Sequence, residues 1–361
     1  MFKQRFFEQL KELASISGGP GNEMKVVERL VDLLEPVSDK VDVDHMGNIY
    51  AYKEGSEPGP TVMVSAHSDE IGCVVRDIDA NGFLRIERTG GMIEALMLGR
   101  KVNVNGHFGV IGVKAGHLQT PEERKSIPSI YDLYVDIGVT SKEEASNLGI
   151  KVGDPITYIS DLDRFTNEDL ICGKAIDNRS CCLLLLELFK ALNKEDFTGT
   201  LVGVIAVQEE VGLRGAKVAT YKVNPDFAIV LDTIPCADTP DSLGSGYPVG
   251  IGRGPVIPAL AGGGVRGNIM APQMKELITR YADKLEVPYQ LAVMSGATTD
   301  LAAVHLEREG ILAGAITFAR RYSHSPVEVA DLNDFEKGLT LLTSLIKDNG
   351  QWGPMEFLKR K

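Results

Sequence analysis

The sequence lacks the long apolar runs, the basic surplus and the paired cysteines that mark several classes of protein. No apolar run is long enough for a bilayer, so we expect no membrane partner. The 38 basic and 50 acidic residues give a net charge of −12, which disfavours nucleic acid because phosphate contacts need clustered Lys and Arg. The 5 cysteines show no paired spacing and favour reduced thiols. With no secretory pattern at the amino terminus, we expect a cytoplasmic protein.

What the sequence does contain is an α/β pattern that is interrupted by a different texture. Two helical segments are followed by short β-rich runs. The β-rich run at 61–66 leads directly into His67. Residues 71–165 form many brief alternating runs separated by glycine and asparagine, which is typical of a small antiparallel barrel. We therefore predict an α/β domain formed by residues 1–70 and 166–361, with a sheet flanked by helices, and an inserted all-β, barrel-like domain at 71–165.

Acidic residues and histidines follow several of the predicted strands. The carboxyl ends of strands in an open α/β sheet are where such folds place their functional sites. One acid after a strand is often only a turn former or a helix cap. Two adjacent carboxylates after an apolar strand, however, cost free energy unless cations neutralise them. The candidate residues are His67, Asp69, Asp177, Glu209, Glu210, Asp232 and His324.

Five of these side chains are suited to two metal ions. Imidazoles and carboxylates without cysteine favour zinc or cobalt, with manganese as a third candidate. Five ligands exceed what one catalytic zinc takes from protein, but they suit two ions that share a bridging carboxylate, which we assign to Asp177. Three carboxylates and one hydroxide would balance two dications. The predicted ligands are His67, Asp177, Glu210, Asp232 and His324.

The two remaining acids have predicted supporting roles. Glu209 would take a proton from the water that bridges the two metals and return it to a leaving amine, as a general base and acid. Asp69, two residues after His67, would accept the imidazole N–H that faces away from the metal. The sequence therefore predicts a hydrolase with two divalent ions in each chain.

Five segments in this order resemble the tetrahedral aminopeptidase family, whose members are often named glutamyl aminopeptidase or cellulase M. The resemblance implies a zinc-exopeptidase-like sheet, an inserted β domain used for dimerisation, and dimers assembled into dodecamers that trim peptides. It also implies that His67 and Asp232 hold one ion, Glu210 and His324 the other and Asp177 both, with Glu209 as the base. Asn178 departs from the family pattern, which usually has a second acid there. The segments are Ala66–Gly72, Gly173–Arg179, Gln208–Ala216, Leu231–Thr233 and His324–Glu328.

We predict a metal-dependent aminopeptidase that releases amino-terminal residues from short peptides. An amidohydrolase that removes acyl groups from amino acids could use the same pair of metals. A glycan hydrolase would instead need two carboxylates around a sugar ring and no metal. A catalytically silent binding protein would leave the ligand set unused. The basic pair Arg320 and Arg321 favours acidic substrates only slightly.

A glycine pattern elsewhere in the chain suggests a nucleotide cofactor by its spacing alone. Gly262, Gly264 and Gly267 match the dinucleotide fingerprint, which requires a strand that leads into the first glycine. Pro255 and Pro258 argue against such a strand, because proline is poorly tolerated inside a sheet. We therefore expect no nucleotide cofactor. The role of the segment 295–300 stays open.

Overall fold

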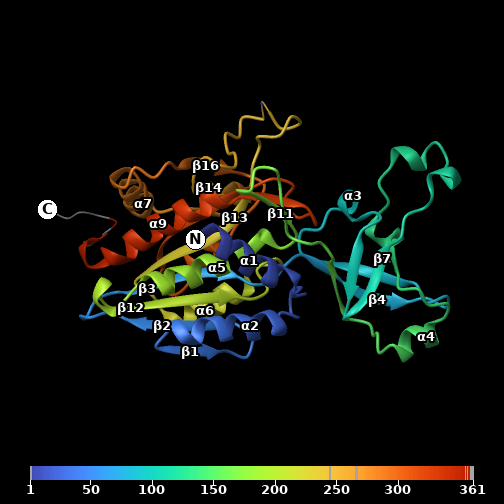
Figure 1. The fold of residues 1–361 in the computed structure, drawn as a ribbon, viewed down its shortest axis with the longest axis horizontal. Helices are drawn as coiled ribbons and strands as arrows, with labels where there is room; N and C mark the ends of the chain where they lie inside the picture. The colour runs from blue at the N-terminus through green and yellow to red at the C-terminus, as the bar shows by residue number, and fades with distance from the viewer. Residues whose placement is uncertain (1, 244, 265–266, 354, 356, 358–361) are drawn as a thin grey trace.

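The computed structural model describes residues 2–243, 245–264, 267–353, 355 and 357. A mixed α/β body carries an all-β barrel at one side (Figure 1). The body is built on a nine-stranded sheet in the order β1-β2-β12-β3-β13-β17-β14-β15, with β16 paired to β14. Its strands are β1 (Lys40–Val43), β2 (Ile49–Glu54), β3 (Thr61–His67), β12 (Thr200–Ala206), β13 (Phe227–Pro235), β14 (Val256–Ala261), β15 (Asn268–Ile269), β16 (Gln290–Met294) and β17 (Leu312–Arg320).

Helices flank this sheet, and their apolar faces form its core. In α1 the buried residues Phe6, Leu10 and Leu13 recur at helical spacing, so that one face of the helix packs inward. α5 lies on β3 and β13 and packs against α1 and α9, whereas α6 lies on β12 and packs against α8. The long helices are α1 (Phe2–Ser15), α2 (Met24–Leu34), α5 (Ile176–Ala191), α6 (Arg214–Val223), α7 (Pro272–Lys284) and α9 (Leu332–Lys347), and α8 (Leu301–Val304) is short.

The barrel is closed by six strands and has its own core. Leu84, Ile86, Val104 and Val135 are fully buried inside it, in a cluster separate from the core of the body. The predicted α/β class and the barrel-like sheet are confirmed. The domain limits 1–70 with 166–361 and 71–165 stay a prediction. The barrel strands are β4 (Gly72–Ile78), β5 (Leu84–Thr89), β6 (Lys101–Val104), β7 (His107–Ile111), β8 (Tyr134–Asp136) and β9 (Pro155–Tyr158), accompanied by the short helices α3 (Glu94–Met97) and α4 (Lys142–Asn147).

A small third sheet brings together two segments that are distant in the sequence. It has the order β10-β11-β18, and β11 pairs antiparallel with β18. This pairing brings the chain before α5 next to the chain after β17, so residues that are far apart in sequence meet beside the main sheet. Its strands are β10 (Asp163–Arg164), β11 (Leu170–Gly173) and β18 (Glu328–Asp331). Among the described residues, no helix has the length and apolar character needed to cross a membrane.

The expectation that no strand leads into the glycines at 262–264 was wrong. β14 does lead into the glycines at 262–264, although it contains Pro258. The register of β14 against β16 shifts between Pro258 and Leu260, so the proline lies at an irregularity where a missing N–H is tolerated. The next described element is the strand β15 and not a helix, so the helix amino terminus that holds a dinucleotide phosphate is missing from this part of the described chain.

Candidate active site

Four neighbouring strands bring the predicted residues to one edge of the sheet. β12, β3, β13 and β17 run parallel, and they are buried along nearly their whole length, so their carboxyl ends share one edge. His67 is the last residue of β3, and His324 lies just beyond β17. Asp232 lies inside β13 and not after it, because that strand continues to Pro235. Asp177 occupies the first turn of α5.

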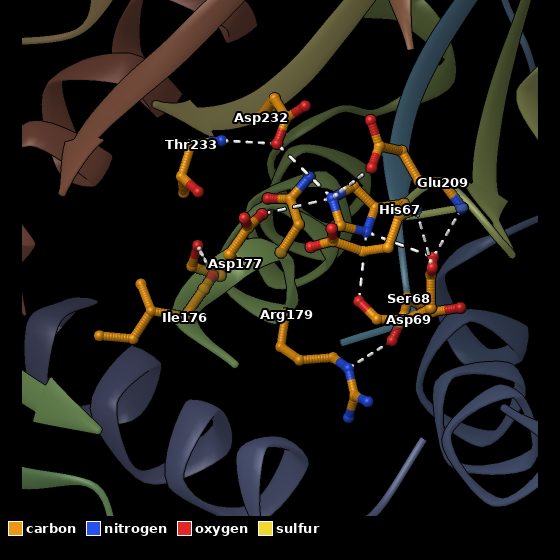
Figure 2. A network of polar contacts seen from close by, with 12 residues as sticks. His67, Ser68, Asp69, Ile176, Asp177, Arg179, Glu209, Asp232 and Thr233 are labelled. Carbon is orange, nitrogen blue, oxygen red and sulfur yellow. Dashed lines mark hydrogen bonds and ion pairs between the residues drawn. The ribbon is translucent and has the colours of Figure 1, made fainter. Parts of the chain in front are cut away.

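His67 is the centre of one group of possible ligands, which we call the His67 cluster (His67, Asp177 and Asp232). His67 Nε2 lies 3.3 Å from Asp177 Oδ1 and 3.6 Å from Asp232 Oδ1. Glu209 Oε2 is slightly farther from the same nitrogen, at 3.9 Å. Figure 2 shows these carboxylates around the imidazole, Asp177 from α5, Asp232 from β13 and Glu209 from the loop after β12. One atom from each member of the cluster lies within 4.8 Å of the others, close enough for one ion.

The His324 cluster (Asp177, Glu210 and His324) lies on the other side of Asp177. His324 Nε2 is 3.5 Å from Asp177 Oδ2 and 3.5 Å from Glu210 Oε1. These three side chains also fulfil the distance requirement for one ion. The two oxygens of Asp177 therefore face two different imidazoles, Oδ1 toward His67 and Oδ2 toward His324.

The charges of the site fit divalent cations. Asp177 Oδ1 is buried and has no hydrogen-bond partner among the described residues, although a buried carboxylate oxygen normally has one. Burial and the neighbouring Asp177 raise the pKa of Glu210 to about 7. Burial also raises the pKa of Glu209 well above its usual value, and the carboxylates of Asp300 and Asp232 add to the effect. Cations would favour the ionised form of all these acids.

Asp69 has a role beyond the predicted one. Its carboxylate accepts hydrogen bonds from the backbone N–H groups of Glu209 and Glu210, each at 3.0 Å. His67 Nδ1 lies 3.4 Å from Asp69 Oδ1 and 3.2 Å from the Asp69 carbonyl oxygen. Asp69 therefore joins the end of β3 to the segment that carries both glutamates. Arg179 supports the same place, since its Nε donates to the Ser68 carbonyl at 2.5 Å (Figure 2).

Sequence reasoning missed two residues that surround Asp177. Arg320 donates a hydrogen bond to Asp177 Oδ2 and another, at 2.6 Å, to Glu328 Oε1. Glu328 in turn accepts the backbone N–H groups of Asp177 at 3.1 Å and of His324 at 3.0 Å. Although burial alone would raise the pKa of Asp177, Arg320 and the two histidines hold it well below the usual value. The sequence linked the basic pair Arg320 and Arg321 only to a slight preference for acidic substrates. In the structure, Arg321 Nε lies 2.8 Å from Asp238 Oδ1 and forms an ion pair with it.

Asp300, in the segment whose role was left open, is also part of the site. It is 1% exposed, and neither carboxylate oxygen has a hydrogen-bond partner among the described residues. Burial raises its pKa to about 8. The segment 295–300 matches the Gly/Thr/Asp loop of the resembled family only loosely, so the sequence did not assign a role to Asp300.

The backbone around the site is unusual as well. Ala175, Gln208, Leu213 and His324 all adopt left-handed φ angles between 55° and 59°, a region that residues other than glycine rarely occupy. Each is a predicted ligand or lies within a few residues of one. Such clustering at one place is characteristic of functional sites, where surrounding contacts hold strained residues in position.

A pocket of about 960 Å³ opens directly over both clusters. The residues that line it include His67, Asp177 and His324, together with uncharged residues such as Tyr247 and Met294. Both imidazoles can therefore face a bound molecule, and the pocket is large enough for a short peptide end.

Comparison with known proteins identifies close likenesses. The sequence profile described as M42 glutamyl aminopeptidase matches residues 47–341. A putative aminopeptidase of Acetivibrio thermocellus is 35% identical over 348 residues, covering 96% of this chain and 100% of the relative. An aminopeptidase structure from Desulfurococcus kamchatkensis is 33% identical with a TM-score of 0.94 and full coverage of both chains. The TET1 peptidase of Pyrococcus horikoshii, which can assemble into a tetrahedron or a large octahedral shell, is 31% identical with a TM-score of 0.83, covering 94% of this chain and 99% of its own.

Proposed function

Because the chain belongs to the M42 glutamyl aminopeptidase family and is a metal-dependent aminopeptidase, we propose that its two imidazole clusters hold two divalent cations. His67 and Asp232 would bind one ion and His324 and Glu210 the other, with Asp177 as the shared ligand. The observation that carries this proposal is the orientation of Asp177, whose Oδ1 faces His67 at 3.3 Å while Oδ2 faces His324 at 3.5 Å. A carboxylate placed in this way between two imidazoles is suited to bridge two metals.

The residues of the site divide the work of peptide hydrolysis. When bound, the cations would polarise the scissile carbonyl and lower the pKa of a water molecule. Glu209, which touches the pocket but belongs to neither cluster as assigned, accepts the proton of the attacking water and passes it to the departing amine. Asp69 is a positioning residue, because it holds the backbone of Glu209 and Glu210 and is not among the described residues that line the pocket.

Zinc and cobalt are the proposed ions, with manganese as a third candidate. The two clusters offer imidazole and carboxylate donors and no thiolate, a set that suits these borderline metals. The test is metal content by mass spectrometry after purification and dialysis, for the wild type and for Asp177→Ala. We expect close to two ions per wild-type chain and at most one in the variant. A wild-type chain that binds a single ion would overturn the assignment.

The substrate is proposed to be the free amino terminus of short peptides. Peptides with a free and with an acetylated amino terminus separate this activity from that of an acyl-removing amidohydrolase, because only the latter acts on the acetylated compounds. A chelator separates it from a glycan hydrolase, which needs no metal. We expect hydrolysis of free-amine peptides alone, lost in chelator and restored by zinc or cobalt. Turnover of acetylated peptides at a similar rate would contradict the proposed substrate.

We further propose that the barrel forms a dimer contact and that dimers assemble into a dodecamer. The support is the likeness to the TET1 peptidase, whose own assembly is a tetrahedron or a larger shell. Light scattering of the purified protein should give a mass near twelve chains, and a stable monomer would refute the assembly. A cytoplasmic location is also a proposal, which fractionation of the source cells would test.

A further inference from the structure

Two glycines of the inserted segment lie against two members of the His324 cluster. Gly90 and Gly91 connect β5 of the barrel to the short helix α3. The carbonyl oxygen of Gly91 is 3.0 Å from His324 Nδ1. A Cβ at Gly90 would lie 3.2 Å from the Cβ of Glu210. The chain that carries the barrel therefore reaches into the candidate active site.

The space at Gly91 is closed by the ring of His324. A Cβ built on Gly91 would lie 2.4 Å from Nδ1 and 2.6 Å from Cε1 of that ring, closer than real Cβ atoms approach their neighbours. The φ angle of Gly91 is outside the left-handed region, so the backbone itself would accept an alanine. The lack of a side chain at this position is thus required by the imidazole and not by the turn.

The hydrogen bond at Gly91 also selects the form of the imidazole. A carbonyl oxygen can only accept, so His324 Nδ1 carries a proton and donates a hydrogen bond to the Gly91 carbonyl oxygen. In the neutral imidazole the lone pair is then on Nε2, the nitrogen that faces Asp177 and Glu210. Partners of this kind fix the tautomer and the ring orientation of histidines that bind metals.

The two imidazoles of the site are held in different ways. His67 Nδ1 contacts Asp69, which is two residues away and belongs to the body of the sheet. The contact of His324 is with a residue 233 positions earlier in the chain, in the inserted segment. The Nδ1 partner of His67 therefore comes from the body, whereas the Nδ1 partner of His324 comes from the insertion.

We propose that Gly91 is a positioning residue for the second cation: its carbonyl oxygen and its missing side chain together hold the His324 ring where Nε2 can bind metal. The inference rests on the proposed two-metal function and adds that the insertion serves ion binding as well as any assembly. Displacing the ring should weaken one ion and leave the other in place. Loss of partners that orient a ligand typically weakens metal affinity about 10–100-fold.

The first experiment compares the metal content of Gly91→Ala and Gly116→Ala. Gly116 belongs to the same insertion, has no left-handed φ, and has nothing within 4 Å of the position of a Cβ, so it is the matched control. After dialysis we expect close to two ions per chain in the wild type and in Gly116→Ala, and close to one in Gly91→Ala. The visible spectrum of the cobalt-loaded protein should lose the contribution of one ion in Gly91→Ala only. Two ions and an unchanged spectrum in Gly91→Ala would overturn the inference.

A double-mutant cycle with His324→Ala tests whether the added methyl group acts through the ring. If it does, Gly91→Ala lowers the melting temperature in the wild-type background and has little effect once the ring is removed. Should Gly91→Ala fail to fold by itself, the double variant should fold like His324→Ala. An equal drop in melting temperature in the wild-type and His324→Ala backgrounds would overturn the inference. A wild-type protein with fewer than two ions would instead refute the proposed function, so the two failures are distinguishable.

Discussion

Arg320 donates a hydrogen bond to Oδ2 of Asp177, and both side chains are buried at the centre of the site. The arginine also contacts Glu328, so one guanidinium compensates two buried carboxylates. The proposed bridging ligand is thus stabilised by a protein cation even before any metal binds. Asp177 therefore has two positively charged partners: the guanidinium of Arg320, which is part of the protein, and the proposed metal ions, which can be removed.

Replacing Arg320 should show how much of the charge of Asp177 is compensated by the arginine and how much by metal ions. In Arg320→Met, Asp177 and Glu328 lose their shared partner, and breaking a buried ion pair in this way costs about 3–5 kcal/mol. We expect the free energy of unfolding to fall more in chelator than in metal-saturated protein, because bound cations compensate the charge of Asp177. Urea unfolding with and without chelator measures the difference. Arg321→Met is the control, since its partly exposed pair with Asp238 should matter by about 1 kcal/mol or less in both conditions. Equal losses for Arg320→Met in both conditions would refute the compensation.

Glu209→Gln should separate proton transfer from metal binding. Glutamine keeps the shape of the side chain but cannot accept a proton, and general base catalysis typically contributes about 10²–10⁴-fold to the rate. We expect kcat to fall by that order while both ions stay bound. Peptide turnover together with metal content provides the measurement. Near-normal turnover would exclude Glu209 as the base.

Removing the metals should lower the stability of the protein. Burial and the charge of Asp177 raise the pKa values of Glu210 and Asp232, so their ionised forms are unfavourable without cations. A ligand that binds only the folded state stabilises it by about 2.7 kcal/mol at 100 times its Kd. The melting temperature should therefore rise when zinc or cobalt is added to metal-free protein. Asp177→Ala should show a much smaller rise. An identical rise in that variant would mean that the ions bind elsewhere.

Asp334, which is not one of the proposed metal ligands, should make the free energy of unfolding depend on pH. Its two oxygens accept the N–H groups of Gly252 and Gly254, each at 2.7 Å, and burial raises its pKa from 3.8 to about 6. The folded protein therefore holds this proton more tightly than the unfolded chain. The contribution of Asp334 is fully present below pH 3.8 and is lost as the pH rises through about 6.

Asp334→Asn removes this titration. The stability of the wild type relative to the variant should fall by at most about 3 kcal/mol between pH 4 and pH 7. Chemical unfolding of both proteins at several pH values measures the difference. A constant difference over this range would show that Asp334 does not titrate as described.

The order of elements in the sheet could be predicted only in part. Apolar strands such as β3 and the two helices that precede the first strands were recognisable, because their residue patterns are local. β14 was rejected because of Pro258, since the bulge that accommodates the proline depends on the neighbouring strand β16. The extent of β13 beyond Asp232 was missed for a similar reason, because β17 pairs with it as far as Pro235.

The sequence by itself determined the chemical identity of the site: imidazoles and carboxylates without thiolates, most of them near the carboxyl ends of apolar strands. These are properties of residue type and local order, which do not depend on the rest of the fold. Only the tertiary structure decided which atoms meet, namely that Asp177 faces both histidines, that Arg320 lies against it, and that Gly91 holds the His324 ring. Those contacts join residues separated by more than a hundred positions, and packing brings them together.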